Sequence, residues 1–243
     1  MTLDNSLKPK FQYQLSRLGK KNDGGYLVGK ETVKKAEVLI SFGIKNDWSF
    51  EKDFKKINNE AKIFCYDNQL DFKLLIRLFI IQSIFVFKNL KFSLLLKNFL
   101  DIFEFYFIRK KITFKKELIS YGDVEKLSEK HQNIFFKIDI DGHEYRILDE
   151  LIAIKDRIIG VVLEIHDIDL HKERVINFCK KIGLELTHNH PNNFAMIDNS
   201  GDPTVLELTF EKTPVKIGEN CIFPNPLDMK NNPLTPDVEL KFK

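Results

Sequence analysis

Short apolar runs alternate with stretches of helical periodicity along most of this 243-residue chain. The apolar runs predict strands over residues 37–42, 63–66, 134–140, 158–165, 184–187, 195–197 and 205–210. The stretches between them predict helices over residues 49–58, 124–130, 142–151 and 171–182, the last ended by Gly183. Several predicted strands are apolar at successive positions, which is typical of parallel strands covered on both faces. The pattern therefore predicts a doubly wound α/β sheet, in which ligands bind at the carboxyl ends of the strands.

Residues 74–116 interrupt this alternation. The segment contains nine basic and two acidic residues and nine of the 22 phenylalanines. Its longest uncharged run, residues 78–87, has ten residues, whereas a helix that crosses a bilayer needs about 20. Apolar residues at helical spacing predict two or three amphipathic helices, inserted as a cap on this domain or as a contact with a second copy. Docking on a membrane surface or on an anionic substrate is the alternative.

The composition is that of an ordinary globular protein, with 43% hydrophobic and 30% charged residues, so wholesale disorder is excluded. The formal net charge of +3 gives no global electrostatic basis for binding nucleic acid. The three cysteines are far apart, which argues against a disulfide framework and a four-thiolate zinc site. Because the N-terminal residues include no apolar signal segment, we expect a cytoplasmic protein.

Two motifs predict a ligand site at the ends of the first two strands. Gly43 lies between an apolar strand and a predicted helix, so the backbone there can approach a ligand closely, and Ser49 is the expected N-cap of that helix. Asp67 follows the next strand, 24 residues after Gly43. An acid at this position holds a ribose diol in nucleotide-binding sheets. A turn formed by Asp67 and Asn68 is the alternative.

Charged residues also mark the end of the strand predicted over residues 134–140. Lys137, Asp139 and Asp141 alternate along it and therefore share one face. Burying charge without a role is costly, so we assign Asp139 to ligand contact. Asp141 is the expected cap of the helix that begins at Gly142, with Glu144 reaching back as in a capping box.

The following strand ends in Glu164 and His166, which share a face. A neutral imidazole is the usual general base near pH 7, so His166 is the candidate base, with Glu164 or Asp141 orienting its ring. Metal ligation is the competing role, and the spacing does not select a ligand set from Asp139, Asp141, Glu164, His166 and Asp167. We assign no metal from the sequence.

Taken in order, these motifs resemble the FkbM-type S-adenosylmethionine-dependent methyltransferases. The resemblance is carried by residues 22–26, 41–51, 64–67 and 137–144, and residues 191–195, 205–209 and 224–233 resemble the C-terminal part of the family. The resemblance implies a Rossmann-like class I methyltransferase domain made of residues 1–73 and 117–243, with residues 74–116 as an inserted helical cap.

The resemblance also implies S-adenosylmethionine as cofactor and a hydroxyl of a sugar or surface-polysaccharide precursor as acceptor. It places the ribose at Asp67, the methionine part at Gly43 and Asp139, and the adenine near Gly122 and Asp123. The expected cofactor-binding residues are Gly24, Gly25, Tyr26, Gly43, Ile44, Trp48, Ser49, Asp67, Asn68, Gly122, Asp123 and Asp139. The expected catalytic residues are His166, Asp141 and Glu164. The basic segment 74–116 favours an anionic acceptor.

Two functions of other classes compete with this one. The run from Asp139 to Gly142 also resembles the first motif of haloacid-dehalogenase-type phosphohydrolases, which would use the Asp139/Asp141 pair around Mg²⁺. That function leaves Gly43 and Asp67 without a role. The other alternative is a non-enzymatic membrane-surface module built around residues 74–116.

Overall fold

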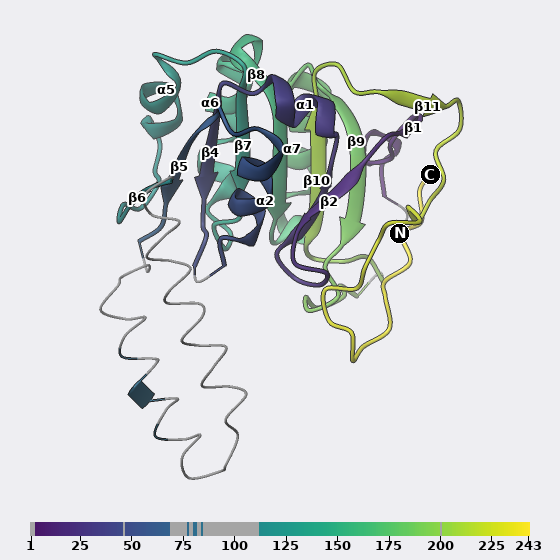
Figure 1. Ribbon diagram of the computed structural model, residues 1–243. Helices are drawn as coiled ribbons and strands as arrows, with labels where there is room; N and C mark the ends of the chain where they lie inside the picture. The colour runs from purple at the N-terminus through teal and green to yellow at the C-terminus, as the bar shows by residue number, and fades with distance from the viewer. Residues whose placement is uncertain are drawn as a thin grey trace.

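A computed structural model describes residues 3–45, 47–68, 77, 80–81, 84, 112–199 and 201–243. Within these residues the chain folds around a seven-stranded sheet of order β6-β5-β4-β7-β8-β10-β9 (Figure 1). The strands are β4 (Val38–Phe42), β5 (Lys62–Tyr66), β6 (Thr113–Lys115), β7 (Ile134–Ile138), β8 (Ile158–Ile165), β9 (Glu185–Pro191) and β10 (Leu206–Glu211). Strands β4 to β8 are parallel, and β10 runs antiparallel to both of its neighbours.

Helices cover both faces of the sheet (Figure 1). One face carries α1 (Lys30–Lys35), α2 (Ser49–Ile57) and the hairpin of β2 (Ser16–Gly19) and β3 (Gly25–Val28). The other carries α5 (Asp123–Ser128), α6 (Leu148–Ala153) and α7 (Ile168–Lys181). Successive strand residues point into opposite cores, so Leu39 and Phe135 pack with α2 while Ile40 and Phe136 pack toward α5 and α6. The two-sided burial predicted from the apolar runs is confirmed.

The smaller elements tie the ends of the chain to this body. The pair β1 (Gln12–Tyr13) and β11 (Lys216–Gly218) forms a separate two-stranded sheet. The backbone N–H of Leu3 donates to the carbonyl of Lys241 at 2.7 Å, which brings the two ends side by side (Figure 1). Three 3₁₀ turns complete the described elements: Asn5–Leu7, Glu144–Arg146 and Lys155–Arg157.

Three of the predicted elements are corrected by the structure. The strand predicted over residues 134–140 ends at Ile138, before Asp139. The strand predicted over residues 195–197 is wrong: these residues lie in a turn after β9, with Met196 82% exposed, and only Ile197 forms an isolated bridge. The helix predicted over residues 142–151 is a 3₁₀ turn followed by α6. The other predicted strands and helices match observed elements, with ends that differ by up to four residues.

Two predicted caps are also wrong. Trp48, not Ser49, is the N-cap of α2, and the Asp47 carboxylate accepts the Ser49 N–H at 3.0 Å. Asp141 caps no helix, because its backbone is left-handed (φ 51°) and its side chain pairs with Lys45. Glu144 does reach back, since its carboxylate accepts the N–H groups of Ile140 at 2.9 Å and Gly142 at 3.3 Å, but it does not form the predicted capping box with Asp141.

The amphipathic helices predicted within residues 74–116 fall almost entirely outside the described residues, so the cap and its suggested contacts stay predictions. At the end of this segment, residues 113–115 form β6 and pair with β5. In the described part of the chain, no helix combines the length and the apolar character needed to cross a membrane.

Candidate active site

The first residue after each of four neighbouring strands lies at one edge of the sheet. Gly43 follows β4, Asp67 follows β5, Asp139 follows β7 and His166 follows β8. These strands are parallel, so the sheet order places Asp67, Gly43, Asp139 and His166 in a row along the carboxyl edge. The chain order reverses between β4 and β7, and ligands of doubly wound sheets bind at such a switch point. The predicted site therefore lies at this switch point, where ligands of such sheets bind.

A cavity of about 160 Å³ opens at this point. Its lining among the described residues is Gly43, Lys45, Tyr66, Asp67, Asn68, Glu117, Leu118, Ile119, Asp139, Ile140, Asp141 and His143. The structure thus brings together five predicted site residues: Gly43, Asp67, Asn68, Asp139 and Asp141. The lining contains four carboxyl groups and one lysine, so the cavity suits a ligand that carries positive charge.

The turn after β4 is held tightly against the neighbouring strand end. Gly43 has φ 72°, and a Cβ at this position would lie 1.6 Å from the carbonyl oxygen of Asp139. The Lys137 ammonium donates to the Gly43 carbonyl at 2.7 Å, and Asp67 accepts the Lys45 N–H at 2.5 Å. Burial disfavours the charge on Lys137, but Asp139 and Glu51 outweigh it, so the pKa of Lys137 is raised. Lys137 and Asp67 therefore shape the turn that forms the cavity wall.

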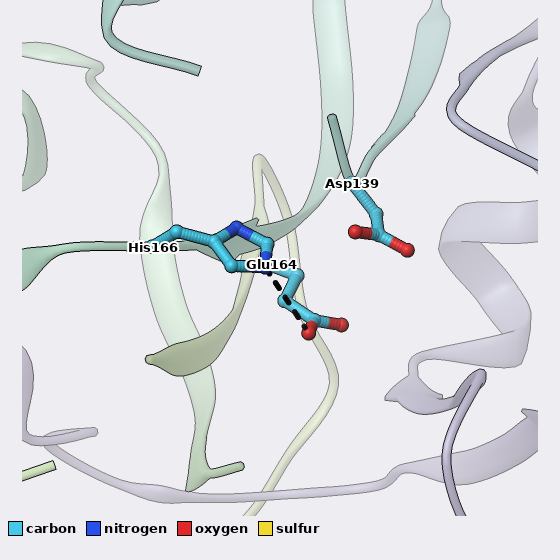
Figure 2. Close-up of side chains that lie close together, drawn as sticks. All are labelled: Asp139, Glu164 and His166. Carbon is cyan, nitrogen blue, oxygen red and sulfur yellow. Dashed lines mark ion pairs between the residues drawn. The ribbon is translucent and has the colours of Figure 1, made fainter. Parts of the chain in front are cut away.

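Asp139, Glu164 and His166 converge beside the cavity (Figure 2). Nε2 of His166 lies 3.8 Å from Oε1 of Glu164, and Nδ1 lies 3.2 Å from Oε1 of Glu144. Glu164 lies beside the ring but too far for a hydrogen bond, so its orienting role stays a prediction; the hydrogen-bond partner of the ring is Glu144, which the sequence did not reveal. Asp141, the other expected orienting residue, instead pairs with Lys45 at 2.9 Å and is 56% exposed.

Glu164 is itself held by two hydrogen bonds. The Tyr26 hydroxyl donates to Oε2 and the Asn192 amide donates to Oε1, both at 2.9 Å. Burial and the negative charge of Asp139 raise the pKa of Glu164 to about 7. At neutral pH this carboxyl group is therefore divided between its two protonation states.

His166 does not have the ordinary pKa that its predicted role assumed. Burial opposes a charged ring, but the hydrogen bond to Glu144 and the charges of Glu164 and Asp139 outweigh it and raise the pKa of His166 to about 9. The surrounding acids therefore favour the charged ring, whereas the predicted role as general base assumes a neutral imidazole at pH 7.

The hairpin residues expected to contact the cofactor lie at the side of the site. The Lys20 ammonium pairs with Asp47 at 3.0 Å, and a Cβ on Gly24 would meet the same carboxylate at 2.5 Å, so the turn of the hairpin contacts the loop after Gly43. Tyr26 is buried and reaches Glu164. None of Gly24, Gly25, Tyr26, Ile44, Trp48 and Ser49 is part of the described cavity lining. Their cofactor contacts stay predictions.

Gly122 and Asp123 also lie outside that lining. The Gly122 N–H donates to Glu150 at 2.7 Å, and Asp123 accepts the Ser120 N–H at 2.8 Å, so both groups serve the start of α5. Residues 117–119, just before them, line the cavity instead. The predicted adenine contact at Gly122 and Asp123 stays a prediction, and the structure places the preceding residues closer to the site.

A further buried acid, which the sequence did not mark, adjoins Glu164. Glu207 on β10 is the cross-strand partner of Glu164 and of His190. Burial and the charge of Glu164 raise its pKa well above the ordinary value. The Asn231 amide donates to Glu207 and, at 3.4 Å, to Asp23, so the C-terminal segment closes this side of the cluster.

No family model and no curated protein matches the chain. Among solved structures, the chain is similar to a precorrin-6y C5,15-methyltransferase from Geobacter metallireducens, with 14% identity, 76% of this chain and 85% of that chain covered, and a TM-score of 0.39. It is also similar to the fibrillarin pre-rRNA processing protein of Methanococcus jannaschii, with 8% identity, 74% and 68% covered, and a TM-score of 0.41. The strand order and the antiparallel β10 described above confirm the predicted doubly wound, Rossmann-like α/β sheet.

Proposed function

We propose that the protein is an S-adenosylmethionine-dependent methyltransferase. The observation that carries the proposal is the row of Asp67, Gly43 and Asp139 along the carboxyl edge, each directly after its strand and each lining one cavity. A backbone turn that only glycine fits, between two carboxylates, matches the requirements of a nucleoside joined to an amino acid.

The residues present fit this cofactor by charge as well as by position. S-Adenosylmethionine carries an ammonium and a sulfonium, and the charged residues of the cavity lining are four acids and one lysine. We assign the ribose hydroxyls to Asp67, which is 7% exposed and has Asn68 beside it in the cavity lining. We assign the amino group to Asp139. When bound, the cofactor supplies a methyl group made electrophilic by the sulfonium.

The acceptor is proposed to be a hydroxyl group of a sugar or a polysaccharide precursor. Asp139 lines the cavity and forms a cluster with Glu164 and His166, which is where we expect a hydroxyl to approach the cofactor. There the protein must align the hydroxyl oxygen and allow the hydroxyl proton to leave. His166, held between two carboxylates, is the residue that we assign to this hydroxyl.

The Mg²⁺-dependent phosphohydrolase is less well supported. It needs Asp139 and Asp141 to act as a pair, but the two side chains take different partners: Asp139 belongs to the cluster with Glu164 and His166, whereas Asp141 binds Lys45 near the surface. The membrane-surface module depends on residues 74–116, which lie almost entirely outside the described residues.

Replacing Asp67 tests the cofactor assignment. Asp67→Ala is expected to weaken S-adenosylmethionine binding by about 1–3 kcal/mol, because the ribose hydroxyls lose a charged acceptor. Isothermal titration calorimetry measures this directly. Asp67→Asn keeps an oxygen for the Lys45 N–H and should lose part of the affinity while preserving the turn.

The matched control is Asp53→Ala. Asp53 also accepts a backbone N–H, that of Gly19 at 3.1 Å, but it lies outside the described cavity lining. Its removal should leave the dissociation constant for S-adenosylmethionine unchanged. Equal affinities for wild type and a folded Asp67→Ala protein would contradict the cofactor site.

The charge of the acceptor is tested by salt. If the acceptor is anionic and meets the basic residues of segment 74–116, its KM should rise steeply with ionic strength. Neutralising Lys110 and Lys111 should raise KM at low salt and flatten that dependence. Steady-state kinetics with nucleotide-linked and uncharged sugars would measure both effects, and an unchanged salt dependence would contradict an anionic acceptor.

A further inference from the structure

Asp139, Glu164 and His166 form a compact set of potential metal ligands at the ends of two neighbouring strands (Figure 2). One ligand atom from each side chain lies within 4.8 Å of the other two. All three are largely enclosed: the side chains are 18%, 7% and 20% exposed. We propose that these three residues bind a divalent cation of the first transition row, such as Mn²⁺.

The imidazole of His166 is oriented as a metal ligand requires. Its Nδ1 is 3.2 Å from Oε1 of Glu144, a carboxylate that is fully buried. A ring that donates Nδ1–H to a carboxylate has its other nitrogen, Nε2, free to coordinate, and metal-binding histidines are commonly held in this way. Nε2 faces Oε1 of Glu164 at 3.8 Å, which is too long for a hydrogen bond but suitable for two atoms that share one cation.

The carboxylates of Glu164 and Asp139 differ in the contacts that hold them. Glu164 is fixed by the Tyr26 hydroxyl and the Asn192 amide, so its position does not depend on a ligand. Lys137 comes no closer to Asp139 than 3.6 Å, and no described residue donates a hydrogen bond to this carboxylate. Asp139 thus contributes a mostly buried carboxylate whose ion pair with Lys137, at 3.6 Å, is longer than the 2.9 Å pair of Asp141 with Lys45.

Other candidate ligands are excluded by their partners or positions. Asp141 pairs with Lys45 at 2.9 Å, and Asp167 does not belong to the cluster formed by the described residues. Glu164 also belongs to a second set, with Asp23 and Glu207, but there the Asn231 amide already bridges the other two carboxylates. The structure therefore selects Asp139, Glu164 and His166 from the larger set that the sequence left open.

One imidazole and two carboxylates suit Mn²⁺ and related ions, and three protein ligands leave coordination positions open. The use of such an ion in catalysis depends on the proposed function, whereas the existence of the site does not. Held by Asp139, Glu164 and His166, the ion would lower the pKa of an acceptor hydroxyl, so that its proton would pass more easily to water while the oxygen takes the methyl group and the sulfur leaves as a neutral thioether. His166 is then a ligand of the ion and not the general base.

The test is a titration of the chelator-treated protein with Mn²⁺ alone, followed by electron paramagnetic resonance. We expect one ion per chain, bound with a dissociation constant below about 1 mM. Asp139→Asn and His166→Gln should each weaken binding at least about tenfold, while Asp141→Asn, a matched acid from the same loop, should bind Mn²⁺ like the wild type. Thermal melting checks that each variant is folded.

The outcomes are separable from those of the proposed function, because no cofactor or acceptor is present in the titration. Absence of saturable Mn²⁺ binding to the wild type would overturn the proposal, and so would equal binding by all folded variants. Calorimetry with S-adenosylmethionine is a separate measurement. A protein that binds Mn²⁺ at this cluster but not the cofactor would keep the metal site and refute the methyltransferase.

Discussion

His166→Gln is expected to lower kcat by about 10²–10⁴-fold, because the acceptor hydroxyl loses the residue assigned to it, which acts on the hydroxyl directly or as a ligand of the proposed ion. Cofactor affinity should hardly change, since Asp67 and Gly43 directly follow β5 and β4 and contact Lys45 and Lys137, not His166. A loss in kcat with an unchanged dissociation constant for S-adenosylmethionine is the pattern that indicates an interaction specific to the reaction. Single-turnover kinetics and calorimetry measure the two quantities.

A second histidine–glutamate pair supplies the control for this experiment. His131 lies 3.2 Å from Glu37, just before β7 begins and therefore at the opposite edge of the sheet. His131→Gln removes the same chemical contact without approaching the site and should retain wild-type turnover. Full turnover by His166→Gln would refute every catalytic role for His166. Loss of wild-type activity with chelator, and its return with Mn²⁺, would identify the role as metal ligation.

The central sheet could be predicted because its strands are buried on both faces. The strand predicted over residues 158–165 has the same bounds as β8, and each of its eight positions is buried. The failures occurred where a short apolar run has no sheet partner: residues 195–197 follow Asn192, whose side chain accepts the Phe194 N–H and turns the chain. The hairpin of β2 and β3 is not among the predicted elements, because the sequence pattern around Gly24 and Gly25 predicts only a ligand contact there.

From the sequence, only those site residues that lie at the ends of strands could be predicted. Parallel strands bring their carboxyl ends to one edge, so the sequence correctly placed Asp67, Gly43 and Asp139 around one cavity. The alternation of side chains likewise placed Glu164 near His166. Glu144 gave no local sign that it would contact His166, 22 residues away, and this contact with the surrounding acids is what raises the pKa of His166 to about 9.

The contact between the turn after β4 and the end of β7 leads to a second large effect. Gly43→Ala would place a methyl group 1.6 Å from the Asp139 carbonyl oxygen, which is backbone and cannot rotate away. The left-handed backbone adds a cost of about 1–2 kcal/mol for any residue with a Cβ. We expect the free energy of unfolding to fall by about 3–5 kcal/mol, and any folded protein to bind S-adenosylmethionine weakly because the cavity wall has moved.

Gly201→Ala separates the two contributions in that prediction. Gly201 has φ 82°, close to that of Gly43, but a Cβ there meets nothing within 4 Å. This variant carries the backbone cost alone, so denaturant unfolding should show a loss of about 1–2 kcal/mol, and calorimetry should show unchanged cofactor affinity. The excess loss in Gly43→Ala then measures how closely the two strand ends approach each other. If both variants lost the same stability and both bound the cofactor normally, the turn after β4 would not form the wall of the site.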